Sequence, residues 1–267
     1  MTAPRRAAQV RQLAAQIWHL AARSVVRQLR QPAHVVPPLF FPLALLAVNA
    51  GGLDAATELP GFPTDSFLAF AFAVPFIQGA LFATLNGGAD LARDIQTGFL
   101  NRLSLTPMRG SALIAGHLAG VVTQGVFQSS FYLAVGLAVG TGLEAGFLGG
   151  VVLLFLAALI ALGFGAFGTF VALRTGSGEA TQATFPLFFV FLFISSMNMP
   201  RDLIEADWFR VAATINPVSY LIEGVRSLII EGWNVQALLL AFGIALGFAA
   251  VAISLSAWSL KLRLTRT

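Results

Sequence analysis

The sequence contains no cysteine, and Lys261 is its only lysine. Without cysteine there can be no disulfide bond, zinc–thiolate site or thiol nucleophile. Without a lysine after a glycine-rich turn there is no phosphate-binding P-loop. The chain therefore cannot be a P-loop ATPase by itself, and we expect it to bind no cofactor and no metal.

Charged residues are also scarce. They make up 10% of the 267 residues, whereas hydrophobic residues make up 57%. Soluble domains carry about 25% charged residues. The composition predicts an all-α membrane protein with one transmembrane domain over residues 1–267. The basic residues lie at the edges of apolar stretches, so membrane lipid is the expected partner and nucleic acid is not.

Six apolar stretches are each long enough, at roughly 20 residues, to cross a bilayer as a helix. The expected spans are about 33–53, 66–91, 111–140, 146–173, 180–200 and 234–259. Before them, residues 9–30 place apolar and basic side chains on opposite sides of a helix. Such a helix lies in the membrane interface with its arginines toward anionic headgroups. The alternative is a soluble helix packed on another subunit.

Basic residues gather on one side of the expected spans. If both termini are cytoplasmic, thirteen of the sixteen Lys and Arg residues are cytoplasmic, and only Arg201, Arg210 and Arg226 lie outside. Nine of the twelve acidic residues then lie outside. Basic residues concentrate on the cytoplasmic side of membrane proteins, so we predict that both termini are cytoplasmic.

The middle of each expected span lacks Asp, Glu, Lys and Arg. Ion-coupled carriers place ionisable residues there, so a secondary carrier is disfavoured, and no residue cluster points to a membrane-embedded enzyme. The second and fifth spans are rich in phenylalanine. Most of these side chains pack in the core or face lipid, but some could line a path for an apolar or amphipathic substrate, with polar groups as directional contacts. The candidate path residues are Phe72, Phe76, Gln78, Phe189, Phe193, Ser196 and Asn198.

Between the second and third spans lies a polar segment, residues 90–109. Gly98 predicts a turn and Pro107 a stop, and about two helical turns fit between them, with Phe99 and Leu103 on one side. An apolar wedge of this kind at a membrane surface can dock into a groove of a soluble partner. The alternative is an ordinary solvated loop.

A short capped helix is predicted before the last span. Asn216 can cap a helix that begins at Pro217 and ends at Gly232. Glu223 and Arg226 lie three residues apart and can pair. The helix is too short to span a bilayer, so we expect it to dip into the outer leaflet or to cover the exit. The residues of this outer helix are Asn216, Pro217, Tyr220, Glu223 and Arg226.

Glycines inside the apolar stretches predict close helix packing. Residues 163–168, Gly-Phe-Gly-Ala-Phe-Gly, fit the dinucleotide-binding fingerprint but lie inside an apolar span without the required strand. We interpret them as a packing surface. Gly243 and Gly247 form a further small pair.

The two polar segments resemble those of the ABC-2 family, the membrane subunits of bacterial ATP-driven exporters. The resemblance rests on residues 98–107, Gly-Phe-Leu-Asn-Arg-Leu-Ser-Leu-Thr-Pro, and on residues 216–221, Asn-Pro-Val-Ser-Tyr-Leu. It implies that the first segment is a cytoplasmic coupling helix and that short re-entrant helices precede the last span. Asn101 departs from the acid usual in the family. The implied coupling residues are Asp94, Gly98, Phe99, Leu100, Arg102, Leu103 and Pro107.

The resemblance also implies a function. The chain would be the permease of an exporter in a bacterial plasma membrane. It would act with a second copy of itself, or a related permease, and two copies of an ATPase subunit that binds ATP and Mg²⁺. The cargo would be a drug, a natural product or a lipid-like molecule. The alternative within the family is a lipid or polysaccharide exporter. Asp90 and Asp94 lie four residues apart on one helix face, and we expect them to pair with Arg93 or with a basic residue of the partner. The alternative for this spacing is a site for a divalent ion.

Overall fold

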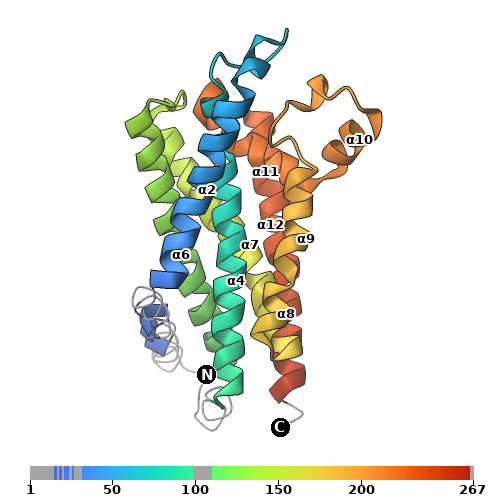
Figure 1. Cartoon of the computed structure of the whole chain (residues 1–267). Coiled ribbons are helices and arrows are strands. Elements are labelled where there is room, and N and C mark those ends of the chain that lie inside the picture. The colour runs from blue at the N-terminus through green and yellow to red at the C-terminus, as the bar shows by residue number, and fades with distance from the viewer. Residues whose placement is uncertain are drawn as a thin grey trace.

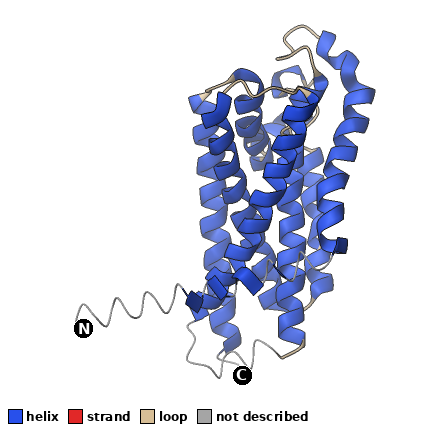
Figure 2. Ribbon diagram, turned by 90° about the vertical axis from the view of Figure 1, so that its left-hand side faces the viewer, coloured by secondary structure: helices blue, strands red, loops and turns tan. Residues whose placement is uncertain are grey.

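The computed structural model describes residues 15–16, 18–19, 21–23, 26, 32–98 and 110–264. In these ranges the chain consists of helices and their connections, with no strand (Figure 2). Long helices run side by side along one axis and shorter elements cover one end (Figure 1). The predicted all-α class is therefore confirmed for the described part of the chain.

Five helices in the described ranges are long and apolar enough to cross a membrane. They lie within a few residues of five of the six expected spans. Their high apolar content and lack of mid-helix charge explain why they remain helical in a hydrocarbon environment, where each backbone N–H must bond within its own helix. The long helices are α2 (Pro32–Leu53), α4 (Val74–Gln96), α6 (Gly110–Val139), α7 (Gly146–Thr175) and α12 (Val235–Leu264).

The expected span 180–200 is not one helix. It consists of α8 (Gly178–Gln182) and α9 (Thr184–Phe193), followed by turns. Pro186 has no backbone N–H and cannot bond to the carbonyl four residues earlier, which explains the break between the two helices. In Figure 1, α8 and α9 still lie end to end along the bundle, and the ring of Phe185 at the start of α9 packs against Phe82 of α4.

One end of the bundle carries the start of α2 and the end of α12 (Figure 1). Hydrogen bonds join three elements there. The side chain of Gln96, the last residue of α4, donates to the carbonyl of Gly176 at 3.2 Å. Arg263 of α12 donates to the carbonyl of Leu173 of α7 at 2.8 Å. The ends of α4, α7 and α12 are thus fixed to one another.

The opposite end is covered by short elements. The chain turns there between α2 and α4, between α6 and α7, and between α9 and α12 (Figure 1). These elements are η1 (Asp54–Glu58), α3 (Phe67–Ala71), η2 (Arg201–Leu203), α10 (Asp207–Ile215), α11 (Pro217–Arg226) and η3 (Ser227–Glu231).

Helix α2 continues through Pro37, Pro38 and Pro42. Pro42 has no N–H, so the carbonyl of Pro38 lacks its usual donor four residues later. The hydroxyl of Tyr132, from α6, donates to that carbonyl instead. A side chain of a neighbouring helix therefore satisfies the backbone group that the proline leaves unpaired.

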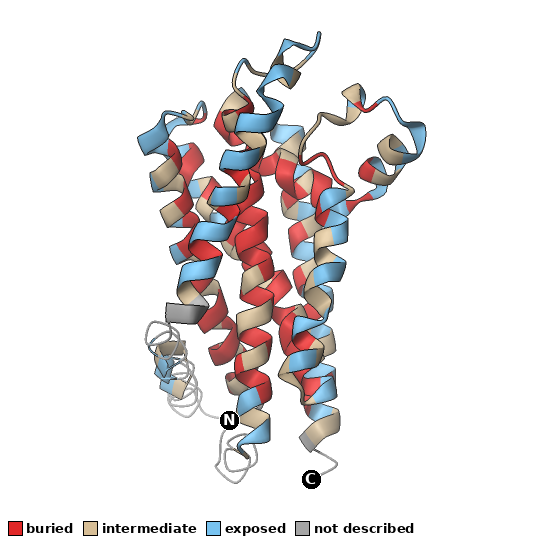
Figure 3. Cartoon of the chain, in the orientation of Figure 1, coloured by how far each residue is buried: buried red, intermediate tan, exposed pale blue. Residues whose placement is uncertain are grey.

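Helix α4 lies in the middle of the bundle and is its most buried span (Figure 3). The glycine-rich segment 163–168 of α7 packs against it and two other helices. A Cβ on Gly163 would lie 2.8 Å from Phe248 of α12, one on Gly165 would meet Val121 of α6, and one on Gly168 would meet the backbone of Thr84 in α4. The predicted packing surface is confirmed.

No other helix of the described chain packs at Gly243 or Gly247, because a Cβ on either glycine would have no atom within 4 Å. The predicted interfacial helix 9–30 falls mostly outside the described residues, and the described part of it is helical. The predicted coupling helix also lies outside them, apart from Gly98 at its start.

Candidate functional site

Asn216 joins α10, α11 and the end of α9. Its side-chain oxygen accepts a hydrogen bond from the backbone N–H of Val218 at 3.0 Å, which is the predicted N-cap. Its amide nitrogen donates to the carbonyls of Phe191 and Ile194, at 2.5 and 2.6 Å. One buried side chain therefore starts α11 and holds it against the end of α9.

Helix α11 is mostly buried. Seven of its ten residues are buried, so it packs among the other elements at this end of the bundle. After Arg226 it continues as the π-helical turn η3. Gly232 then ends the segment at a φ of +87°, a left-handed conformation that glycine adopts most easily. The predicted start and end of this segment agree with the structure.

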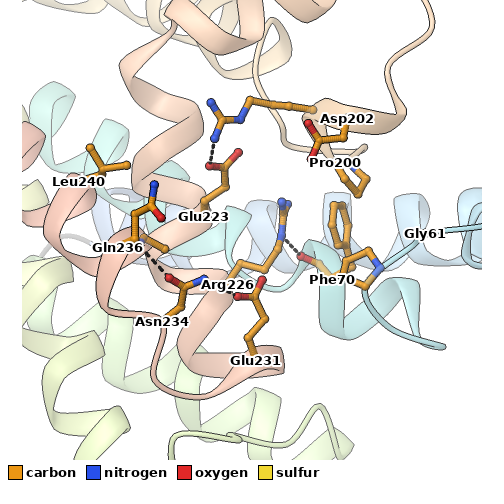
Figure 4. Close-up of a pocket in the computed structure, with 13 residues that line it drawn as sticks. Gly61, Phe70, Pro200, Asp202, Glu223, Arg226, Glu231, Asn234, Gln236 and Leu240 are labelled. Atoms are coloured by element: carbon orange, nitrogen blue, oxygen red, sulfur yellow. Dashed lines mark hydrogen bonds and ion pairs between the residues drawn. The ribbon is translucent and has the colours of Figure 1, made fainter.

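Arg226 lies at the centre of this end of the bundle, with only 4% of its surface exposed. Its Nε donates to the carbonyl of Phe70 at 2.8 Å (Figure 4). Its Nη2 donates to the carbonyls of Ser196 and Met197 at 2.9 and 3.1 Å. The guanidinium carbon also lies 3.5 Å from the centre of the Phe70 ring, a cation–π geometry. Arg226 thus connects α11 to α3 and to the turn after α9.

The pairing predicted between Glu223 and Arg226 was wrong. Glu223 accepts a hydrogen bond from Nη2 of Arg201 at 2.7 Å instead, and Arg201 stacks over the ring of Tyr220 at 4.5 Å. A spacing of three residues permits a surface ion pair. Arg226 is drawn inward because carbonyls at helix ends and turns lack intrahelical donors, and its guanidinium supplies them.

Burial lowers the pKa of Arg226 to about 9, and the charges of Glu223 and Glu231 oppose this shift. The group therefore stays protonated near neutral pH. Beside it lies a pocket of about 390 Å³ with mixed charge (Figure 4). Its charged lining residues are Arg201, Asp202, Glu223, Arg226 and Glu231.

The candidate path residues do not come together in one place. Phe72 packs against Gly136, and the ring of Phe76 meets that of Tyr132 edge-on at 5.8 Å, so both point toward α6 inside the subunit. Phe193 of α9 is half exposed on the outside of the bundle. The prediction of a path stays a prediction.

The remaining path residues lie in three different places. Gln78 is fully buried in α4, whereas Phe189 of α9 packs against Phe41 of α2, with ring centres 6.2 Å apart. Ser196 is buried beneath α11, where its backbone N–H donates to the hydroxyl of Ser219 at 3.1 Å. Asn198 lies near it, in the turn that precedes Pro200.

At the other end of the bundle, Asp94 interacts with Arg23. Nη1 and Nη2 of Arg23 donate to the two carboxylate oxygens at 3.3 and 3.0 Å, a two-pronged pair. The structure thus gives Asp94 a partner within its own chain, from the segment before the first span, which was not among the partners we expected. Gly98 follows at a φ of +68°, as expected for the predicted turn.

The chain can now be compared with known proteins. Residues 15–230 match the family model described as ABC-2 type transporter. The chain belongs to the ABC-2 type transporter family. As a member of this family with several apolar helices, it is a multi-pass membrane protein and a subunit of an ABC transporter.

Two relatives carry transport names. The daunorubicin resistance ABC transporter permease protein DrrB1 of Streptomyces coeruleorubidus is 27% identical over 202 residues, or 73% of this chain and 66% of the relative. The putative transport permease ycf38 of Cyanophora paradoxa is 25% identical over 215 residues, or 80% of this chain and 73% of the relative. The match thus spans just under two thirds of the first relative's length.

Sequence reasoning missed three polar residues of α6. Gln124 and Gln128 are 7% and 2% exposed, and Tyr132 is fully buried. Their spacing of four residues places them on one face of a helix, so this stripe could have been recognised in an otherwise apolar stretch. Sequence reasoning also missed the Arg201–Glu223 pair, whose partners lie 22 residues apart.

Proposed function

We propose that this member of the ABC-2 type transporter family is the permease of an ATP-driven exporter in a bacterial plasma membrane. It moves an apolar or amphipathic molecule outward by alternating access. A separate ATPase subunit, present in two copies, binds ATP and Mg²⁺ and drives the change. A second copy of the chain, or a related permease, completes the membrane part.

The observation that carries this proposal is the distribution of charge between the two ends of the bundle. The end where α4, α7 and α12 meet carries Arg23, Arg93, Arg174, Lys261 and Arg263. The opposite end carries nine acidic residues of the chain's twelve. Basic residues concentrate on the cytoplasmic side, which supports a cytoplasmic position for both termini and for the connection between α4 and α6.

This orientation requires six crossings, with α8 and α9 together forming the fifth. It also presents residues 98–107 to a cytoplasmic ATPase as the coupling helix. The name of the Streptomyces relative favours a natural product or drug as cargo. A lipid or polysaccharide remains the alternative cargo.

The central experiment is the variant Phe99→Ala. An aromatic side chain that fills a groove at an interface commonly contributes about 2 kcal/mol or more, so the variant should bind the ATPase roughly thirtyfold more weakly. Copurification of the ATPase and ATP-driven export in vesicles are the measurements. Phe147→Ala is the matched control, because Phe147 is 89% exposed at the acidic end. Normal association and export in Phe99→Ala would show that residues 98–107 are an ordinary loop.

The orientation has its own test. Two reporters are fused after Thr267. One that works only in the cytoplasm should be active, and one that works only after export from the cell should be inactive. The reverse result would contradict both the orientation and the coupling role of residues 98–107.

A further inference from the structure

The contact between α4 and α6 has an unusual composition for the core of a membrane protein. On α4, Gly79 and Gly87 face α6. A Cβ on Gly79 would lie 3.0 Å from the ring of Tyr132 and 3.4 Å from the side-chain oxygen of Gln128, and a Cβ on Gly87 would lie 2.8 Å from Val121. A smooth glycine surface on one helix therefore meets a partly polar stripe on the other. We call this contact the α4–α6 seam.

Amide groups in and beside the seam have no hydrogen-bond partner among the described residues. Both amide atoms of Gln78 and of Gln124 are buried and unpaired, as is the side-chain oxygen of Gln128. Gln124 shares the helix face of Gln128, four residues away, and Gln78 is next to Gly79 on α4. The oxygen of Gln128 points at the glycine surface itself.

Unpaired amides are costly in such a place. Water is scarce in the hydrocarbon core, so a polar group there normally bonds within the protein. A half-satisfied polar cluster is less stable than an apolar one of the same shape. Polar residues inside a membrane domain are usually functional. We therefore look for the hydrogen-bond partners of these amides in a second state of the permease.

The two helices of the seam are also placed to move relative to each other. They are neighbours in sequence, joined only through residues 97–109, the connection that the proposed function assigns to the ATPase. A pull on this connection acts directly on the end of α4 and the start of α6. At Gly79 and Gly87 only the backbone of α4 faces Tyr132 and Val121 of α6, so no α4 side chain at these two positions opposes a lengthwise shift.

The interface between α7 and α12 provides a contrast. The hydroxyl of Ser256 on α12 donates to the carbonyl of Ala166 on α7 at 2.7 Å, and Arg263 of α12 donates to Leu173 of α7 at 2.8 Å. In each of these two hydrogen bonds the donor and acceptor residues lie 90 positions apart in the sequence. The two bonds hold α7 and α12 in one register.

We propose that α4 and α6 slide along each other at the α4–α6 seam during the transport cycle, and that the amides of Gln78, Gln124 and Gln128 form in the shifted register the hydrogen bonds that they lack in this one. The proposal rests on the proposed function, because it assumes a cycle driven through residues 97–109. The buried glutamines are positioning residues in this scheme. The α7–α12 pair, to which Gln96 joins the end of α4, is the fixed part, and α6 moves against it.

Disulfide locking tests the slide, and the absence of native cysteine removes any background. The pair Gly87→Cys and Val121→Cys crosses the seam, and the pair Gly163→Cys and Ala249→Cys crosses α7–α12, where a Cβ on Gly163 would lie 3.5 Å from the Cα of Ala249. Each purified permease is oxidised, its remaining thiols are blocked, and it is combined with the copurifying ATPase in vesicles. The four single-cysteine variants control for folding.

We expect the oxidised seam pair to lower ATP hydrolysis by the complex about tenfold, with recovery on reduction, because the locked step belongs to the cycle. The oxidised α7–α12 pair should change it less than about twofold. The proposal would be overturned if both oxidised pairs lost ATP hydrolysis equally, or if the oxidised seam pair lost none. It would also be overturned if the seam pair did not form a disulfide. If the unmodified permease does not associate with any ATPase, the proposed function has failed instead.

A second measurement needs no ATPase. Gln128→Met removes an unpaired amide from the observed register with little change of volume, so the thermal unfolding midpoint of the isolated permease should rise. Ser130→Ala is the control, because the exposed hydroxyl of Ser130 already bonds to Val126 of its own helix, and no change is expected. A lower midpoint for Gln128→Met would mean that the amide is bonded in the resting state, and the slide would have no basis.

Discussion

Arg226 at the acidic end and Gln128 in the middle of the bundle are both almost fully buried, but they differ in their hydrogen bonds. The guanidinium of Arg226 donates to three backbone carbonyls. The side-chain oxygen of Gln128 accepts no bond from the described residues. A buried polar group with all its partners fixes the elements around it, whereas one without partners favours a second arrangement. The comparison assigns rigidity to the acidic end and mobility to the α4–α6 seam.

The strongest test of this comparison is Arg226→Met. The change leaves the carbonyls of Phe70, Ser196 and Met197 without their donor in a buried place, so we expect a loss of about 3 kcal/mol or more in the free energy of unfolding. The thermal midpoint in detergent is the measurement. Arg226→Lys should recover only part of the lost free energy of unfolding. A single ammonium group cannot donate to all three carbonyls as the planar guanidinium does.

Arg210→Met is the matched control at the same end. Arg210 pairs with Asp207, which is largely exposed, and donates to one carbonyl, so its replacement should cost far less. A similar loss in Arg210→Met and Arg226→Met would mean that the stability of the acidic end responds to any change of charge. Arg226 would then not be a specific anchor.

Asn216→Ala is expected to have the next largest effect. It removes the cap of α11 and the two bonds to the end of α9, for a combined loss of about 2 kcal/mol. Faster amide exchange over residues 217–231 is the measurement. Asn216→Asp keeps the acceptor of the cap but not the two donors, so it separates the two contributions. Unchanged exchange in the alanine variant would show that α11 is held by burial alone.

The smallest effect should come from Arg23→Ala. The side chain of Arg23 is 41% exposed, and exposed ion pairs contribute roughly 0.5 kcal/mol or less. The difference from the wild type in thermal midpoint should shrink further in high salt, because ions screen the pair. A loss that persists in high salt would mean that Arg23 and Asp94 connect structural parts as firmly as Arg226 does.

Part of the candidate site could be predicted from local sequence. The Asn216–Pro217 cap and the stop at Gly232 depend on residues adjacent in the chain, and local backbone preferences decide them. The partner of Arg226 could not be predicted in this way. It depends on carbonyls at Phe70 and Ser196, which lie 156 and 30 residues away in sequence.

The break in the expected fifth span shows a related difficulty. Residues 180–200 are apolar, as their composition predicted. Hydrophobicity, however, does not indicate whether the backbone hydrogen bonds of a helix continue without a break. Pro186 was visible in the sequence. Its effect near a helix start depends on which residue begins the helix, and packing decides that.

By itself, the sequence determined that this chain is a helical membrane protein, where its long apolar helices lie and which end carries the basic residues. Those properties follow from the length of apolar runs and from the placement of charge, which are local in the chain. Only the tertiary structure decided that Gly163, Gly165 and Gly168 pack while Gly243 and Gly247 do not. It also decided that Arg226 is anchored and that the amides near Gly79 are unpaired, because hydrogen bonds in the core depend on which helix faces which.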